Sequence, residues 1–214
     1  APHPLLMELL RAIAAPRDVK LHVVSGRTRE TLEQWLGRLP IGLHAEHGLW
    51  SRMGPDREWT RNASPQDRWM ESVRKILDEY VARTPGSWVE SKSASLAWHY
   101  RAADPYVGAL QAKELRFHLV ESLAQQPVDV LAGEKVLEVR PQGVNKGLIA
   151  RALAGDGNGH GNGRFVAFGD DRTDEDLFAA LPAGSLTFHV GAIPSRADYR
   201  LAGPREVRSM LEQV

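Results

Sequence analysis

The sequence contains no cysteine, so disulfide bonds, thiol chemistry and zinc sites built on thiolates are excluded. It has no apolar run near the roughly 18 residues needed to cross a bilayer, and no secretory signal is visible. Lysine plus arginine and aspartate plus glutamate number 27 each, so there is no basic excess of the kind that nucleic-acid binding requires. These absences predict a cytoplasmic protein that binds neither membrane nor nucleic acid.

What the sequence does contain is enough apolar residues for a sizeable core. Its 214 residues are 43% hydrophobic and 25% charged, which is typical of a folded globular chain. Strand and helix patterns alternate over residues 1–48 and 142–214, which predicts an α/β core with a parallel sheet. Residues 49–141 indicate helix, two strands, helix and two strands, and therefore a small α+β domain inserted into the core. A helix is expected to begin at Ser64-Pro65, and residues 156–163 are interpreted as a glycine-rich connector.

The densest group of acidic side chains follows an apolar run at residues 165–168. Asp170, Asp171 and Asp174 stand where this run ends and a helix begins, with Thr173 as the expected N-cap. Ligands bind at the carboxyl ends of parallel strands, and oxygen donors suit Mg²⁺. The pattern therefore predicts a metal site, although a solvated acidic helix start is the alternative, because acids favour first turns.

Two further positions point to an anion. Ser25 follows a predicted buried strand and precedes Gly26, where a hydroxyl could donate to a phosphate oxygen, although serine is also common in turns. Lys146 stands at the start of a predicted helix, where a cation is electrostatically unfavourable unless an anion lies nearby. The alternative for Lys146 is a solvated side chain. Together with the acids, these residues can converge on one phosphate and one Mg²⁺.

Charged residues of both signs alternate along the strands of the middle block. Glu90 and Lys92 share one strand face, His99 and Arg101 do likewise, and a further strand region holds Lys135 and Glu138. Carboxylates accept hydrogen bonds from sugar hydroxyls, while lysine and arginine donate them, so the pattern suits a polyol. Cross-strand salt bridges on an exposed sheet face explain it equally well.

The order of these motifs resembles the haloacid-dehalogenase-like phosphatases, and within them most resembles the trehalose-6-phosphate phosphatases. The resemblance covers nearly the whole chain. Its most specific part is the acidic stretch 169–176, preceded in the chain by Ser25-Gly26-Arg27 and Asn145-Lys146-Gly147. Further support comes from Ala45-Glu46-His47-Gly48, residues 90–92, 99–101 and 135–141.

This resemblance implies a Rossmann-like core with a mobile inserted cap, Mg²⁺ as cofactor, and an aspartate nucleophile that forms an aspartyl-phosphate intermediate. Ser25 would hold the transferring phosphoryl group and Lys146 would neutralise its charge. Asp170 would bind Mg²⁺ directly, supported by Asp171 and Asp174.

The resemblance also implies a substrate and a partner. Glu90, Lys92, Arg101, Lys135 and Glu138 would be the sugar-binding set of the cap, with Arg27 as a further substrate-binding residue. Closure of the cap would exclude water. The implied substrate is trehalose 6-phosphate, and a trehalose-phosphate synthase is the expected partner.

One motif of the resembled family is absent. The family's Asp-x-Asp-Gly-Thr motif, which supplies the nucleophile, does not occur in the 214 residues. It would belong on a strand before Ala1, at the centre of the sheet, so a truncated chain is the expected explanation. These residues alone are then expected to bind Mg²⁺ weakly and not to form a competent phosphatase. The alternatives are a non-catalytic sugar-phosphate-binding or regulatory domain, and a phosphatase acting on mannosyl- or glucosyl-3-phosphoglycerate.

Overall fold

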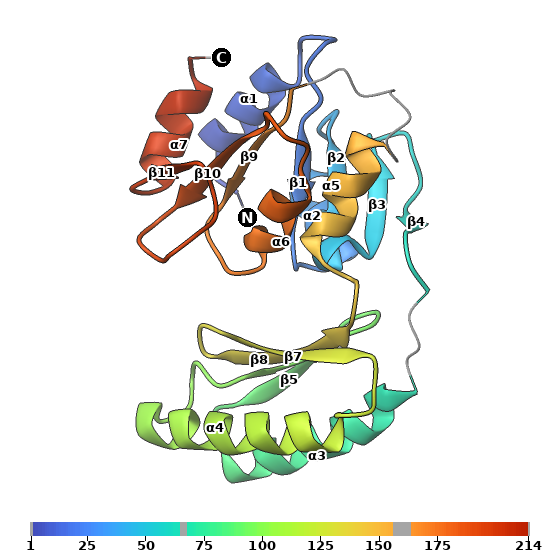
Figure 1. Cartoon of the computed structure of the whole chain (residues 1–214), viewed down its shortest axis with the longest axis vertical. Coiled ribbons are helices and arrows are strands. Elements are labelled where there is room, and N and C mark those ends of the chain that lie inside the picture. The colour runs from blue at the N-terminus through green and yellow to red at the C-terminus, as the bar shows by residue number, and fades with distance from the viewer. Residues whose placement is uncertain (1, 65–67, 156–163, 214) are drawn as a thin grey trace. The chain divides into compact units, whose positions relative to one another are not determined.

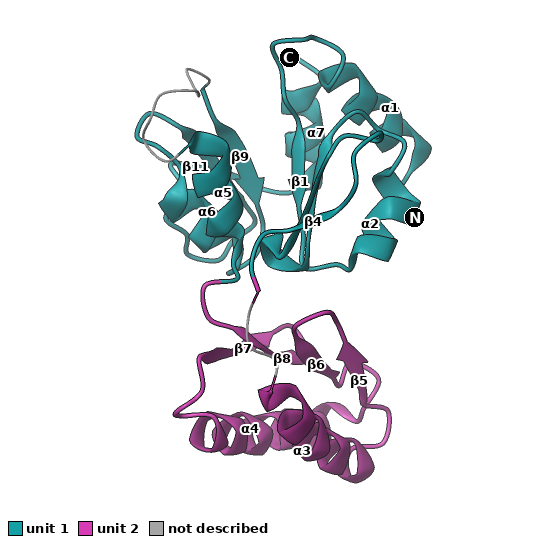
Figure 2. Ribbon diagram, turned by 90° about the vertical axis from the view of Figure 1, so that its right-hand side faces the viewer, with its two compact units in different colours: residues 1–63, 144–214 teal, residues 64–143 magenta. Residues whose placement is uncertain are grey.

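The computed structural model describes residues 2–64, 68–155 and 164–213. The helix start expected at Ser64-Pro65 falls partly, and the connector at 156–163 entirely, outside these residues. The chain divides into two compact units, coloured teal and magenta in Figure 2. Unit 1 comprises Ala1–Ala63 and Val144–Val214, and unit 2 comprises Ser64–Gly143. The α/β class with parallel sheet elements, and an α+β block between two core segments, are confirmed.

The first part of unit 1 builds a four-stranded sheet with the order β1-β2-β3-β4 (Figure 1). β1 and β2 are parallel, while β3 and β4 continue the sheet as an antiparallel meander. The elements are α1 (Pro4–Ile13), β1 (His22–Val24), α2 (Arg29–Leu36), β2 (Gly42–Ala45), the 3₁₀ turn η1 (Glu46–Gly48), β3 (Trp50–Met53) and β4 (Thr60–Arg61). The first boundary therefore falls after Ala63 and not at residue 49, because β3 pairs with β2.

The last part of unit 1 builds a parallel three-stranded sheet with the order β11-β10-β9. Among the described residues no ladder joins β9 to β1, so each is the edge strand of its own sheet. The elements are α5 (Lys146–Ala154), β9 (Val166–Gly169), α6 (Asp174–Ala180), β10 (Leu186–Val190), β11 (Tyr199–Leu201) and α7 (Pro204–Leu211).

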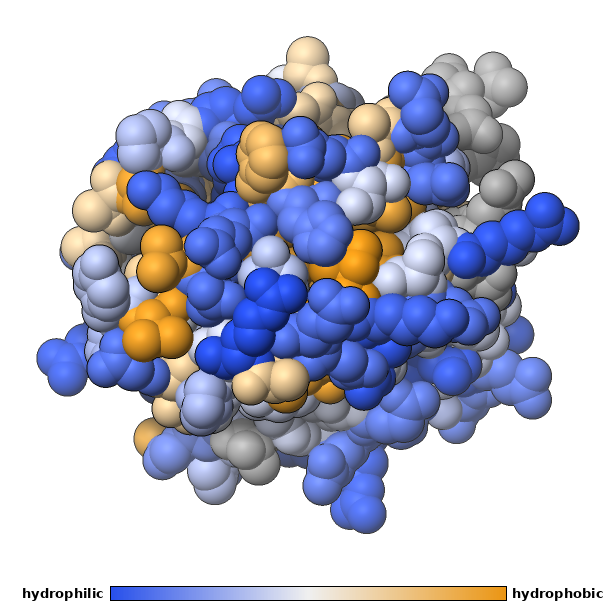
Figure 3. Space-filling view, turned by 90° about the horizontal axis from the view of Figure 1, so that it is seen from below, coloured by the Kyte–Doolittle hydropathy of each residue, from blue (hydrophilic) through white to orange (hydrophobic). Residues whose placement is uncertain are grey.

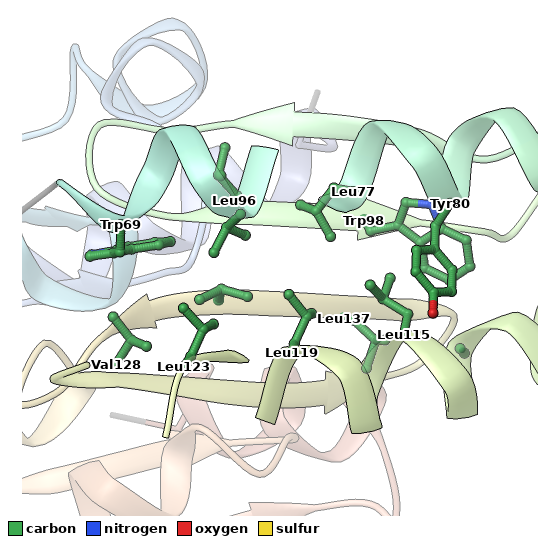
Figure 4. Packing of buried hydrophobic residues seen from close by; sticks show 13 residues of the cluster. Trp69, Leu77, Tyr80, Leu96, Trp98, Leu115, Leu119, Leu123, Val128 and Leu137 are labelled. Atoms are coloured by element: carbon green, nitrogen blue, oxygen red, sulfur yellow. The ribbon is translucent and has the colours of Figure 1, made fainter. Parts of the chain in front are cut away.

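Unit 2 is an antiparallel sheet of order β5-β6-β8-β7 with α3 and α4 on one face. Residues alternate between the two faces of its strands, so Leu96, Trp98, Leu137 and Val139 meet the helices and form the core seen in Figure 4. Burying each such side chain contributes about 1.5–3 kcal/mol. The elements are α3 (Trp69–Arg83), β5 (Trp88–Ser91), β6 (Leu96–His99), α4 (Pro105–Ser122), β7 (Val128–Gly133) and β8 (Val136–Pro141).

Helix α4 is apolar on two sides. Leu115 and Leu119 are fully buried in the core of unit 2, while Leu110 and Phe117 are exposed, at 46% and 65%. The surface on the side of α3 and α4 is mostly hydrophilic with separate apolar patches (Figure 3). No helix in the described part of the chain is long and apolar enough to cross a membrane.

Candidate functional site

Asp174 is the centre of the acidic loop. This residue opens α6 and is only 4% exposed. Its Oδ1 accepts a hydrogen bond from Nζ of Lys146 at 2.7 Å, and its Oδ2 accepts from the backbone amides of Asp170 and Asp171 at 3.0 and 3.1 Å. One carboxylate therefore fixes both the loop after β9 and the lysine that opens α5.

Gly169 makes this arrangement possible. A Cβ at this position would lie 2.3 Å from Cβ and Cγ of Asp174, a distance that real Cβ contacts do not show. Gly147 plays the same part in α5, because a Cβ there would lie 2.5 Å from the carbonyl oxygen of Asp176. The two glycines allow β9 and α5 to pack closely against α6.

Asp171 is held as a carboxylate by its neighbours. Its Oδ1 accepts hydrogen bonds from the amide and the hydroxyl of Thr173, both at 2.6 Å. Desolvation would raise the pKa of Asp171, but the charge of Lys146, the hydrogen bonds from Thr173 and the influence of His47 outweigh it, so the pKa is lowered. Thr173 is the N-cap residue of α6, as predicted, but its hydroxyl bonds to Asp171 and makes no cap hydrogen bond.

Ser25 ends the parallel strand β1, as the sequence predicts. Its amide donates to the carbonyl of His44 and its carbonyl accepts from the amide of His47, both at 2.9 Å. Its Oγ accepts from the amide of Arg27 at 3.2 Å. The guanidinium of Arg27 stacks over the ring of Trp35 at 4.5 Å, so this exposed side chain lies along α2.

The turn η1 is a functional candidate to which sequence reasoning gave no role. Glu46 and His47 have positive φ angles of 49° and 58°, followed by Gly48 at 99°. The His47 ring lies against Gly26, where an added Cβ would come within 2.6 Å of Nε2. In the sequence this stretch only supports the family resemblance, and a glycine after two polar residues at a strand end does not identify left-handed non-glycine residues.

The carboxylate oxygens of the acidic loop are suitable ligands for a magnesium ion. Asp170 is exposed, and its carboxylate bonds to no other described residue. Asp171 uses only Oδ1 in its hydrogen bonds, whereas both oxygens of Asp174 are engaged. Within residues 2–64, 68–155 and 164–213 no group of three acids or histidines is arranged to hold a metal. Mg²⁺ is commonly held by only one or two carboxylates, with waters as its other ligands. Asp170 and Asp171 can provide these two carboxylates.

Unit 2 brings some of its predicted residues together. Glu138 accepts from Nζ of Lys92 at 3.1 Å and from Oγ of Ser95 at 2.9 Å, and the Lys92 and Glu138 side chains are 9% and 13% exposed. Glu90 lies 2.9 Å from Nε2 of His99. Glu90, Ala97 and Glu138 occupy one cross-strand row, on the sheet face opposite to the helices. The salt bridges foreseen as the alternative explanation are thus part of this face.

Like Lys92, which directly follows β5, two more predicted residues of unit 2 lie outside its strands. Arg101 follows β6 and pairs with Glu134 at 3.6 Å, with both side chains largely exposed. Lys135 adopts a φ of 62° in the turn before β8, and its Nζ lies 5.7 Å from the ring centre of Tyr100. The structure does not group either of them with Glu138.

The fold of the chain is that of the haloacid dehalogenase-like hydrolases. A hydrolase of this class from Bacteroides thetaiotaomicron shares the fold with a TM-score of 0.69 over 97% of this chain and 90% of its own, at 15% identity. The sequence profile of the trehalose-phosphatase family matches residues 1–204. The chain belongs to the trehalose-phosphatase family.

Relatives of known sequence are longer than this chain. It is 41% identical over 209 residues to the bifunctional trehalose-6-phosphate synthase/phosphatase of Thermoproteus tenax, covering 98% of this chain and 28% of that protein. It is 40% identical over 181 residues to the alpha,alpha-trehalose-phosphate synthase (UDP-forming) B of Dictyostelium discoideum, covering 84% of this chain and 22% of that protein. The chain thus spans a minor part of the length of both.

Solved structures match over nearly the whole chain. The C-terminal domain of Candida albicans trehalose-6-phosphate phosphatase gives a TM-score of 0.89 at 32% identity, covering 99% of this chain and 84% of the other. Aspergillus fumigatus trehalose-6-phosphate phosphatase gives 0.68 at 37% identity, covering 99% and 83%. The C-terminal domain of a Candida albicans trehalose synthase regulatory protein gives 0.81 over 96% and 85%, but at 18% identity it shares the fold alone.

Proposed function

We propose that this chain is a trehalose-6-phosphate phosphatase domain, which acts in the hydrolysis of trehalose 6-phosphate to trehalose and phosphate. The observation that carries the proposal is the buried Lys146–Asp174 pair, tied to the amides of the acidic loop in a member of this family. It supports a site for a phosphoryl group, because a buried ammonium beside exposed carboxylates suits a phosphate with a magnesium ion. Two relatives named as phosphatases, at 32% and 37% identity, support the choice of substrate.

Each side chain of the site has a role in this proposal. The Ser25 hydroxyl donates to the phosphoryl group, and the Lys146 ammonium offsets its negative charge. Asp170 and Asp171 hold Mg²⁺, while Asp174 keeps Lys146 and the loop in place. When bound, Mg²⁺ supplies Lewis-acid stabilisation of the phosphoryl oxygens. None of these residues is assigned the role of nucleophile, because the Asp-x-Asp-Gly-Thr motif does not occur in the 214 residues.

Unit 2 is proposed to act as the cap that recognises the sugar. The cross-strand row of Glu90 and Glu138, together with Lys92, offers carboxylate acceptors and an ammonium donor to hydroxyl groups. Arg27, Arg101 and Lys135 are kept as substrate-binding candidates with less structural support. Carboxylates beside the bases favour a neutral disaccharide over the phosphoglycerate substrates, whose carboxylate would be repelled.

Phosphate release from trehalose 6-phosphate by the natural full-length protein tests the proposal. We expect release that requires Mg²⁺, is abolished by EDTA, and exceeds release from glucosyl-3-phosphoglycerate. Lys146→Ala should remove it, whereas Lys113→Ala, at an exposed position of α4, should not. No Mg²⁺-dependent release from any sugar phosphate would contradict the proposal and favour a regulatory domain.

The proposal extends to a partner and a location. Two relatives are named as trehalose-phosphate synthases, one of them bifunctional, which supports a synthase as the functional partner. A cytoplasmic location agrees with the use of sugar phosphates. Co-purification of synthase activity with the full-length protein from a cytosolic fraction tests both, and recovery without synthase activity would argue against the partner.

A further inference from the structure

His47 connects parts of unit 1 that are far apart in the sequence. Its amide donates to the carbonyl of Ser25 at 2.9 Å, and its ring occupies the space where a Cβ of residue 26 would lie. The residue is 8% exposed. The neighbouring Gly48 lies against α5, since a Cβ there would come within 2.8 Å of the Ile149 side chain.

The backbone of this turn is strained and firmly supported. Glu46 and His47 are in the left-handed region, which only a few per cent of non-glycine residues enter, with asparagine, aspartate and histidine over-represented among them. The amide of Glu46 donates to the carbonyl of Arg27 at 2.9 Å. Strain of this kind persists only where the surroundings over-determine it, and it concentrates at functional sites.

A chain of hydrogen-bonded polar side chains supports the turn from the sheet. The side-chain amide of Asn62 donates from Nδ2 to the carbonyl of Gly48 at 2.8 Å and to Oγ of Ser51 at 2.6 Å. Oγ of Ser51 lies 2.7 Å from Nδ1 of His44, whose Nε2 lies 3.0 Å from Nδ1 of His22. The support runs from β1 through β2 and β3 to the carbonyl of Gly48, the residue that follows His47.

We propose that His47 is a positioning residue of the phosphate site, whose imidazole holds the Ser25 loop in register with α5, against which Gly48 lies. The inference rests on the proposed function of that site. His47 acts through Ser25: the ring fills the space over Gly26 and thereby fixes the Ser25–Arg27 backbone. Removing the ring frees that loop, although the left-handed backbone itself becomes easier to form.

His47→Gly separates the ring from the backbone, because glycine tolerates a positive φ. We expect the full-length variant to melt no lower than the natural protein. Its kcat for trehalose 6-phosphate should fall at least tenfold while KM changes less than threefold, and its Kd for inorganic phosphate should rise at least fivefold. Asparagine also tolerates a positive φ and retains a polar side chain. The kcat and the phosphate Kd of His47→Asn should therefore lie between those of the natural protein and His47→Gly.

Gly26→Ala supplies a matched second substitution. Its methyl group would lie 2.6 Å from Nε2 of His47, so we expect kcat to fall at least tenfold. In the double variant the methyl group enters the space that the ring has left, so the double variant should be no worse than His47→Gly alone. Losses that multiply in the double variant would overturn the inference.

Two outcomes of the hydrolysis and phosphate-binding measurements distinguish a failure of this inference from a failure of the proposed function. If the natural protein hydrolyses trehalose 6-phosphate and His47→Gly matches it in kcat and phosphate Kd, the inference is wrong and the function stands. If the natural protein hydrolyses no sugar phosphate but binds inorganic phosphate more tightly than His47→Gly does, the function fails and the inference stands. Absence of both hydrolysis and phosphate binding in the natural protein overturns both.

Discussion

Nζ of Lys146 lies 2.7 Å from Oδ1 of Asp174, and the two side chains are only 9% and 6% exposed. Breaking a buried ion pair by removing one partner leaves an uncompensated charge away from water. Asp174 also accepts hydrogen bonds from the amides of Asp170 and Asp171, so its carboxylate satisfies three donors at once. The stability of the acidic loop and the position of Lys146 therefore both depend on the side chain of Asp174.

Asp174→Ala should lower the free energy of unfolding by about 3–5 kcal/mol, because it leaves the buried Lys146 ammonium unpaired. Urea unfolding followed by circular dichroism measures the loss. The matched control is Asp78→Ala, which removes an exposed pair with Arg74 on α3 and should cost no more than about 0.5 kcal/mol. Equal losses of unfolding free energy in the two variants would show that the buried pair stabilises the protein no more than the exposed pair does.

Gly169→Ala should destabilise the protein by about 1–3 kcal/mol, the usual cost of overpacking. The added methyl group would lie 2.3 Å from Cβ and Cγ of Asp174 and must displace the carboxylate. Gly203→Ala is the control, since a Cβ there meets nothing within 4 Å and its φ of 179° is extended. Unfolding curves in urea for both variants check this, and a Gly169→Ala protein as stable as Gly203→Ala would contradict it.

The sequence predicts where the candidate residues stand along the helices and strands better than it predicts their contacts. An apolar run followed by acids indicates that Asp174 stands at the start of α6, because periodicity and caps are local signals. That Asp174 pairs with Lys146 depends on the packing of α5 against α6, which Gly147 permits at long range. No local pattern reports such a contact.

The errors have the same origin. The sequence pattern places the start of the inserted domain at residue 49, but β3 and β4 extend the first sheet. Arg101 was assigned to a strand face by alternation, which continues in the sequence beyond the point where β6 ends at His99. The left-handed backbone of His47 is set by tertiary contacts, so nothing in its neighbours predicts it.

Stability should fall as the pH is lowered from 7 to 5, because of the buried histidines of the first sheet. Burial, together with the neighbouring His22, lowers the pKa of His44 to about 3, and burial and then Lys20 lower the pKa of His22. In the unfolded chain both imidazoles return to a pKa of about 6.5, so between about pH 3 and 6.5 the unfolded state binds more protons. The His44 contribution is fully present above pH 6.5 and decreases by up to about 1.4 kcal/mol per pH unit below it.

His44→Asn provides the comparison for this pH dependence. Urea unfolding at pH 7.5, 6.5, 5.5 and 5.0 should show a shallower decrease of stability for the variant, since it lacks one of the two groups that must take up a proton on unfolding. The variant will be less stable at pH 7.5, because Ser51 and His22 lose a hydrogen-bond partner. The slope decides the matter: equal slopes in variant and natural protein would mean that His44 does not carry the effect.

Lys92→Ala should weaken recognition of the sugar without affecting the chemistry of phosphate release. Lys92 and Ser95 both donate to Oε1 of Glu138, so removing the ammonium takes away a donor to hydroxyl groups and loosens the carboxylate. We expect KM for trehalose 6-phosphate to rise about tenfold, which corresponds to about 1.4 kcal/mol of binding. The turnover of a small aryl phosphate, which has no sugar, should stay within twofold. Steady-state kinetics of the full-length protein on both substrates measure this, with Lys113→Ala as the control. Parallel losses on the two substrates would show that Lys92 acts in the folding of unit 2 and not in sugar binding.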